Sequence, residues 1–177
     1  MPMHPLPLLL SAAAMTLVAA CATPPAPPSP PPSDAFVLED FFPGRTVGQG
    51  SFVNSWTGSQ RRFDVVIEGS WDGRTLTLVE DFAYDDGERD RKTWRLERQS
   101  PGVYTGTRED VVGTARAWTD GPAVRLEYTV KLGGWTVDFA DVLAYGEAGS
   151  MINKATVGKW GLRIGRVELV MRKAPAS

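Results

Sequence analysis

Residues 63–84 read FDVVIEGSWDGRTLTLVEDFAY, and this stretch decides the fold class. Apolar and polar side chains alternate within 63–71 and again within 75–84. An alternation of period two is the pattern of a β-strand with one buried face. The Asp72-Gly73 pair between the two runs supplies the positive φ that a tight antiparallel connection needs. The stretch therefore predicts a β-hairpin.

The same pattern continues through the rest of the chain to Lys173. Turn signals recur at intervals of roughly 12 to 18 residues; they are Asp86-Gly87, Pro101-Gly102, Asp120-Gly121, Gly133-Gly134 and residues 146–149. No long stretch has a helical period. We expect about eight to ten strands in an all-β, single antiparallel up-and-down β-barrel of the lipocalin-like type, because closure removes exposed strand edges. The parity of the apolar positions changes at Gly165, where a β-bulge would allow it.

The N-terminal segment has the composition of an export signal. Residues 1–20 contain no Lys, Arg, Asp or Glu, and their apolar run is too short for a comfortable membrane span. The run ends in Leu-Val-Ala-Ala-Cys21, which resembles the lipobox of bacterial lipoproteins, although the usual basic residue before the apolar run is missing. The resemblance implies that 1–20 is a signal peptide and that Cys21 is acylated. An ordinary signal peptide with an incidental cysteine is the alternative.

The residues after Cys21 predict a tether and a location. Seven of the twelve residues in 22–33 are proline, so residues 21–33 form a lipidated cysteine and an extended linker of about 35–40 Å. A docking ligand for an aromatic groove is the alternative interpretation of the linker. Ala22 stands where an Asp would resemble an inner-membrane retention signal, which favours the outer membrane facing the periplasm. The barrel domain is expected at 34–177.

The composition excludes several kinds of chemistry from the barrel domain. The one Cys and the one His of the chain, Cys21 and His4, both precede the domain. Catalytic triads with His, His-ligated metals and internal disulfides are therefore excluded there, and we expect neither a metal nor a cofactor. Lys and Arg total 19 against 21 Asp and Glu, and this balance argues against nucleic acid as a partner.

Two carboxylates fall at positions whose neighbours in the alternation point inward. Glu80 and Asp141 share the parity of apolar residues on their runs, and Arg116 shares the parity of Trp118. A buried carboxylate needs a partner, a water path or a raised pKa. Arg116 or Lys154 could supply the positive partner.

These residues support three interpretations. In the first, they lie at strand ends or form a satisfied internal salt-bridge network. In the second, Glu80, Arg116 and Asp141 recognise the polar end of a ligand whose apolar tail lies on tryptophans; these are Trp71, Trp94, Trp118 and Trp135. In the third, the carboxylates act as an acid/base pair. Separately, residues 153–161 could rest on a membrane surface through their lysines and Trp160, or could form a plain loop.

Several strings occur in an order that resembles a known family. They are residues 63–73, residues 76–88, Asp-Val-Val-Gly-Thr-Ala at 110–115 and Ile-Asn-Lys-Ala-Thr at 152–156. With the lipobox, they resemble the bacterial lipoproteins of domain of unknown function family 3833. The resemblance implies a calycin-type barrel in an uncharacterised family and favours a lipid-related role. It supplies no catalytic or binding residues.

The sequence thus leaves three functions open. The first is a lipid-anchored envelope protein that binds or carries an apolar small molecule or fatty acyl lipid, which predicts an interior cavity of several hundred Å³. The second is a filled barrel that acts as a structural or interaction module with an envelope protein partner, which predicts a large exposed apolar patch. The third is a carboxylate-based lipid-modifying enzyme.

Overall fold

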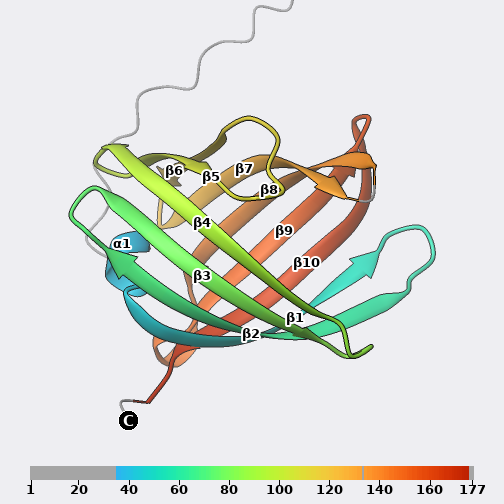
Figure 1. Ribbon diagram of the computed structural model, residues 1–177, viewed down its shortest axis with the longest axis horizontal. Coiled ribbons are helices and arrows are strands. Elements are labelled where there is room, and N and C mark those ends of the chain that lie inside the picture. The colour runs from blue at the N-terminus through green and yellow to red at the C-terminus, as the bar shows by residue number, and fades with distance from the viewer. Residues whose placement is uncertain (1–34, 133, 176–177) are drawn as a thin grey trace, which may run out of the picture.

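The computed structural model describes residues 35–132 and 134–175, and these form a closed barrel of ten antiparallel strands (Figure 1). A short helix, α1 (Leu38–Phe41), precedes the strands. The strands are β1 (Gly44–Asn54), β2 (Gln60–Trp71), β3 (Thr75–Tyr84), β4 (Arg89–Ser100), β5 (Val103–Thr107), β6 (Ala115–Asp120), β7 (Ala123–Leu132), β8 (Trp135–Tyr145), β9 (Met151–Lys159) and β10 (Leu162–Lys173), with a 3₁₀ turn at Glu147–Gly149. Each strand pairs with the next, and β10 pairs with β1. The predicted all-β, up-and-down barrel is confirmed, whereas the signal peptide, Cys21 and the linker lie outside the described residues.

The hairpin predicted from residues 63–84 forms as β2 and β3. Phe63 lies opposite Tyr84, and Trp71 lies opposite Leu76. Because cross-strand partners point to the same face of a sheet, one set of alternate residues on both strands lines the interior. Glu80, opposite Ile67, belongs to this inward set.

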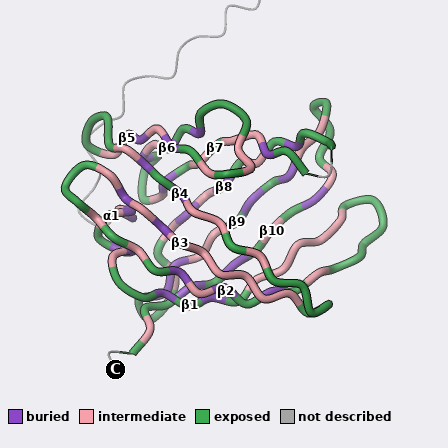
Figure 2. The backbone as a smooth tube through the Cα atoms, in the orientation of Figure 1, coloured by how far each residue is buried: buried purple, intermediate pink, exposed green. Residues whose placement is uncertain are grey.

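A plug built around α1 closes one end of the barrel. Phe36, Leu38, Phe41 and Phe42 are all buried in the main core, as the purple segment at α1 in Figure 2 shows. The Phe36 and Phe41 ring centroids are 5.4 Å apart. The plug is tied to the wall through Glu39. That carboxylate is 3.0 Å from the Arg98 guanidinium and accepts a hydrogen bond from the Tyr104 hydroxyl.

The wall of the barrel is incomplete in one place. Strands β5 and β6 are short, and the pairing of β4 with β5 begins only at Arg95. Residues 89–94 of β4 therefore have no strand partner on that side. The loop 108–114 lies there instead, and its Glu109 carboxylate accepts a hydrogen bond from the Thr93 N–H over 2.9 Å. This loop also bonds to β7, where the Val112 N–H donates to the Thr129 carbonyl over 2.8 Å. The half of the barrel away from the plug has a loop in place of a paired strand.

The bulge predicted at Gly165 is present. The pairing of β9 and β10 shifts between Arg163 and Gly165, so that Ile164 is the extra residue. A Cβ atom at Gly165 would lie 2.4 Å from the Phe52 ring, so the glycine lets that ring lie against the backbone. The ten strands of the closed barrel and the plug all lie within residues 35–132 and 134–175, so these residues hold a self-contained barrel. No helix in these residues is long and apolar enough to cross a bilayer.

Candidate functional site

Two carboxylates point into the interior of the barrel from strands on opposite sides of its wall. Glu80 comes from β3 and Asp141 from β8, and both side chains point inward as the alternation predicts. Only 12% of the Glu80 side chain and 4% of Asp141 are exposed. The charge of Asp141 contributes to raising the pKa of Glu80, so the two carboxylates interact.

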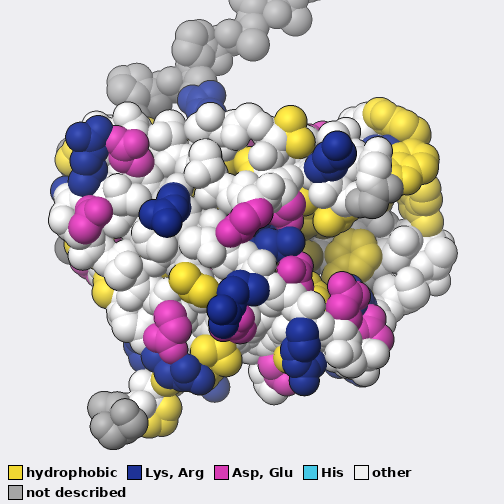
Figure 3. Space-filling model, viewed as in Figure 1, with side chains coloured by type: hydrophobic (Ala, Val, Ile, Leu, Met, Phe, Trp, Pro, Cys, Tyr) yellow, Lys and Arg dark blue, Asp and Glu magenta, His cyan; other side chains and the backbone are white. Residues whose placement is uncertain are grey.

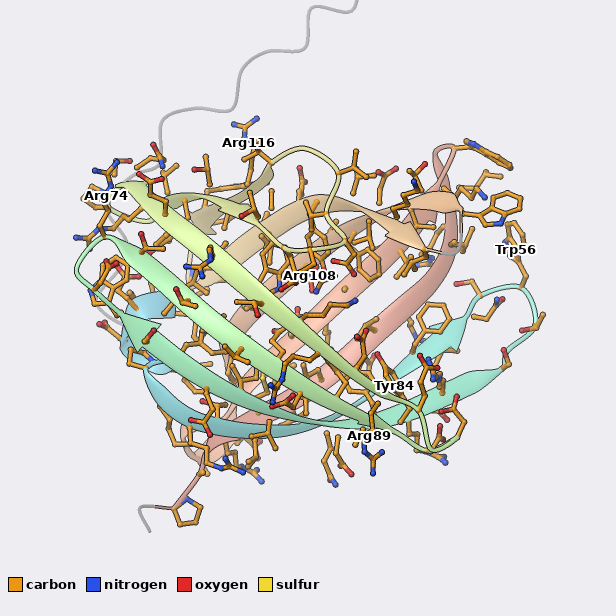
Figure 4. All side chains as sticks on the ribbon, viewed as in Figure 1. Trp56, Arg74, Tyr84, Arg89, Arg108 and Arg116 are labelled. Carbon is orange, nitrogen blue, oxygen red and sulfur yellow. The ribbon has the colours of Figure 1, made fainter. Side chains whose placement is uncertain are left out.

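The cation of the site is Arg108, which is not among the residues expected from the sequence. It is the first residue of the loop after β5, and its side chain turns into the barrel (Figure 4). Its Nε donates to Asp110 over 2.7 Å, and its guanidinium nitrogen lies 3.8 Å from Glu80 Oε2. The guanidinium also lies over the rings of Trp94 and Tyr128, at 4.8 and 5.3 Å from their centroids. A buried charge is stabilised here by both ion pairs and aromatic faces.

The expected positive partners do not reach the site. Arg116 is exposed on the outer face of β6 and points away from the barrel (Figure 4). Lys154 is also exposed. The inward positions of β6 are held by small side chains such as Ala117, which lies opposite the large, buried Tyr104 of β5. Because Tyr104 fills that part of the core, the small Ala117 faces inward and its neighbours Arg116 and Trp118 face outward. The prediction that Arg116 points into the barrel is therefore wrong.

The four candidate tryptophans occupy four different places. Trp94 is buried beside Arg108 within the site. Trp71 lies toward the plug, with the Arg98 guanidinium over its ring. Trp118 is half-buried on β6, the strand that also carries Arg116. Trp135 is 56% exposed at the start of β8. The structure therefore brings only Trp94 together with Glu80 and Asp141.

Three acceptor atoms in the site have no hydrogen-bond partner among the described residues. They are Glu80 Oε2, Asp141 Oδ2 and Asn153 Oδ1. The other oxygen of Asp141 accepts a 2.6 Å hydrogen bond from the Asn153 side chain. Buried polar atoms are paired in the great majority of cases, so a group of unpaired acceptors needs an explanation.

Burial sets the protonation of the two carboxyls. It raises the pKa of Glu80 from 4.5 to about 7, against the opposing charge of Arg108. It raises the pKa of Asp141 from 3.8 to about 6, opposed by the Asn153 hydrogen bond and by the nearby Tyr128 hydroxyl. Near neutral pH, Glu80 is therefore divided between a form that only accepts and a form that can also donate a hydrogen bond.

A second ion-pair group lies beside the gap in the wall. The Lys92 ammonium is 3.1 Å from Asp90 and 3.5 Å from Asp110, which also binds Arg108. Figure 3 shows the molecule hollowed on this side, with charged side chains around a hydrophobic floor. The ion pairs among Lys92, Asp110 and Arg108 therefore form a polar border on this side of the barrel.

Aromatic side chains line the barrel between the site and the end opposite the plug, which we call the mouth. Tyr128 and Phe139 stack with their ring centroids 5.1 Å apart. Phe63 and Phe82 are 5.6 Å apart, and Tyr84 stacks on Phe82 at 6.1 Å. Phe82, Tyr84, Tyr128 and Phe139 point inward but are only half-buried. The mouth half of the interior therefore presents accessible apolar surface.

A depression of about 410 Å³ lies on the mouth half of β1–β4, with Gln49, Arg62, Asp64, Tyr84 and Arg89 among its lining residues. It includes none of the seven ligand-binding candidates, so it is not the interior cavity that the sequence analysis expects. Within residues 35–132 and 134–175, no group of three acidic, His or Cys side chains could hold a metal ion.

The ten-strand closed barrel is a lipocalin-like fold. Residues 15–173 match the model of a family described as "Protein of unknown function (DUF3833)", and the chain belongs to this family. The resemblance noted from the sequence is thus confirmed. No match was found among curated proteins.

Two solved structures align with this chain at low sequence identity. The S-type phycobiliprotein lyase from Guillardia theta aligns with a TM-score of 0.56 and 6% identity, over 76% of this chain and 89% of that one. A redesigned β-barrel, mFAP1, bound to DFHBI, aligns with a TM-score of 0.41 and 10% identity, over 76% of this chain and 97% of that one. The first of these similarities supports the lipocalin-like fold and nothing further.

Proposed function

We propose that this barrel binds an amphiphilic fatty acyl lipid, with the polar end at Glu80 and Asp141 and the acyl chain toward the mouth. The observation that carries the proposal is a pair of buried carboxylate oxygens, Glu80 Oε2 and Asp141 Oδ2, that accept no hydrogen bond from the described residues. An unsatisfied buried acceptor costs about 1–3 kcal/mol, more when it is charged. A ligand that supplies hydrogen-bond donors would remove this cost.

The surroundings of the two oxygens define the ligand's chemistry. Because both free atoms are acceptors, the complementary group is an O–H or N–H donor, such as a hydroxyl or amide head group. A fully ionised anionic head is disfavoured, because Arg108 already lies among Glu80, Asp110 and two aromatic rings. The half-buried aromatic zone toward the mouth suits the apolar remainder of the ligand.

The proposal includes the membrane anchor expected from the sequence. An acylated Cys21 and the proline-rich linker would hold the barrel in the cell envelope, most simply at the outer membrane facing the periplasm. In that position the barrel has a source of acyl lipids within reach of its tether.

Native mass spectrometry of residues 34–177 tests the binding. Monooleoylglycerol is a suitable probe, because it carries two hydroxyls and one acyl chain. We expect one bound molecule per barrel, and we expect Glu80→Leu and Asp141→Leu each to weaken binding about tenfold, the equivalent of one lost hydrogen bond. Glu68→Leu is the matched control, since Glu68 is an exposed carboxylate on β2.

Two results would contradict the proposal. One is a wild-type barrel that stays empty after incubation with the probe and carries no lipid from the cell. The other is equal binding by the wild type and by both interior variants. An empty barrel would favour the alternative of a structural or interaction module.

A further inference from the structure

Three hairpin turns at the mouth carry exposed apolar side chains, which together we call the tryptophan rim. Its members are Trp56 between β1 and β2, Leu132 and Trp135 between β7 and β8, and Trp160 and Leu162 between β9 and β10. Trp56 is 70% exposed and Trp160 is 80% exposed. The Trp135 and Trp160 ring centroids are 6.1 Å apart, and Figure 4 shows Trp56 at this same end of the barrel.

Folding does not explain the rim. Half of the six tryptophans of the chain belong to it, although each gains little burial there. Trp160 has a φ of 53°, in the left-handed region, and is followed by Gly161 at 76°. Such a turn favours Asn-Gly, and a bulky side chain at the first position costs about 1–2 kcal/mol. A large indole is thus kept at a tip where the backbone favours a smaller residue.

Positive charge lies around two of the three rim turns, those between β7 and β8 and between β9 and β10. The Lys159 ammonium lies 3.0 Å from the Trp135 ring centroid and 4.4 Å from that of Trp160. Residues 154–167 contain two Lys and two Arg and no acidic residue, and residues 128–137 contain Lys131 and no acidic residue. The acidic turn between β3 and β4 is also at the mouth, but Asp86 and Glu88 both pair with Arg61, at 2.7 and 2.5 Å.

We infer that the tryptophan rim docks on the surface of a phospholipid bilayer that contains anionic lipids. Indoles settle at the headgroup level of a membrane, because their rings are apolar and their N–H group is polar. Lys131, Lys159 and Arg163 provide charge complementary to lipid phosphates, and their long stems keep the charged ends at the interface. This contact would set the mouth of the barrel against the membrane.

The rim lies far from where the chain enters the barrel. The described residues begin at Ala35 beside the plug, and the rim is at the opposite end (Figure 1). The docking surface therefore lies at the other end of the barrel from Ala35, the first described residue after the expected linker. It can be tested without an acyl chain, on residues 34–177, which contain the complete barrel.

The test is sedimentation with vesicles, together with quenching of tryptophan fluorescence by brominated lipids. Vesicles of phosphatidylcholine with 30% phosphatidylglycerol should pellet the barrel, and vesicles of phosphatidylcholine alone should pellet it less. The triple variant Trp56→Ser, Trp135→Ser, Trp160→Ser should lose at least tenfold in partition coefficient. Lys159→Gln should lose about fivefold, the equivalent of one surface charge.

Two control variants make the outcome decisive. Val47→Ser with Val170→Ser removes exposed apolar side chains from β1 and β10 and should bind like the wild type. Glu80→Leu should also keep vesicle binding, which separates this inference from the proposed ligand site. Absence of wild-type binding to the anionic vesicles, or equal binding by the triple variant, would overturn the inference. If the wild type does not bind the anionic vesicles but crosslinks to an envelope protein through the rim, the surface belongs to a protein partner.

Discussion

At the scale of single residues, the protonation of Glu80 makes the stability of the barrel depend on pH. Its pKa is 4.5 in the unfolded chain and about 7 in the barrel, so between these values the folded state binds more protons. The free energy of unfolding therefore falls as pH rises through this window. Asp141 acts in the same direction between pH 3.8 and about 6.

We predict that Glu80→Gln stabilises the barrel at pH 8 by up to about 3 kcal/mol and has little effect at pH 4.5. The amide removes the cost of a buried charge, and that cost is present only where Glu80 is ionised. Urea unfolding at the two pH values measures the difference, with the exposed Glu68→Gln as control. An equal loss of stability at both pH values would contradict the prediction, because it would show that the effect of the amide is steric and independent of charge.

Arg108 carries the opposite prediction. Removing one partner of a buried ion pair leaves the other uncompensated, at a cost of roughly 3–5 kcal/mol. We expect Arg108→Met to destabilise the barrel by about 3 kcal/mol at pH 8 and by less at pH 5, where Glu80 is mostly protonated. Arg116→Met, on the outer face, should change the unfolding free energy by less than about 0.5 kcal/mol. Equal effects of the two substitutions would contradict the placement of Arg108 at the centre of the site.

The sequence predicts residues on regular strands and misses residues beside irregular ones. Glu80 and Asp141 lie within long strands, where parity determines facing. Arg108 follows a five-residue strand and stands next to two acidic residues, a pattern that resembles a solvated loop. Arg116 shares its parity with one aromatic neighbour, Trp118, on the short strand after that loop, and parity there predicts the wrong face.

At the scale of elements, the bulge in β10 gives a test with an internal control. A Cβ at Gly165 would lie 2.4 Å from the Phe52 ring, whereas a Cβ at Gly158 would meet nothing closer than 3.7 Å. We expect Gly165→Ala to destabilise the barrel by about 2 kcal/mol, the usual cost of overpacking. Gly158→Ala should cost much less. Thermal unfolding compares the two, and Phe52→Leu should rescue part of the loss in the Gly165→Ala background.

The same scale shows which elements the sequence can predict. The bulge at Gly165 follows from a change of parity along a long run and needs no tertiary information. The plug helix has only four residues, so it has one turn and no measurable period. The helix acts as a plug because Phe36, Phe41 and Phe42 pack within the main core. The sequence around the helix does not show these contacts with distant strands.

At the scale of the whole molecule, the barrel has two different ends. The plug and its aromatic residues close one end, and the rim of exposed tryptophans surrounds the other. The alternation of apolar and polar residues and the turn signals predict the closed, up-and-down topology. Each hairpin joins strands that are consecutive in the sequence, so the pairing of β10 with β1 is the one contact between distant segments that closes the barrel. The interior volume is not predictable in the same way, since it depends on how Tyr104, Trp94 and the plug fill the core.

The two ends lead to a prediction about membrane attachment that uses both. We expect Cys21→Ser to abolish acyl labelling, because the lipobox thiol is the proposed site of acylation. Without the acyl chain, attachment would rest on the rim alone, whose interfacial binding depends partly on charge and weakens with salt. The Cys21→Ser protein should therefore leave the membrane fraction in high salt, whereas the wild type should stay. Adding the three rim serines to Cys21→Ser should release it at low salt as well. Acyl labelling that persists in Cys21→Ser, or salt-resistant attachment of the protein with all four substitutions, would show that another part of the chain holds it to the membrane.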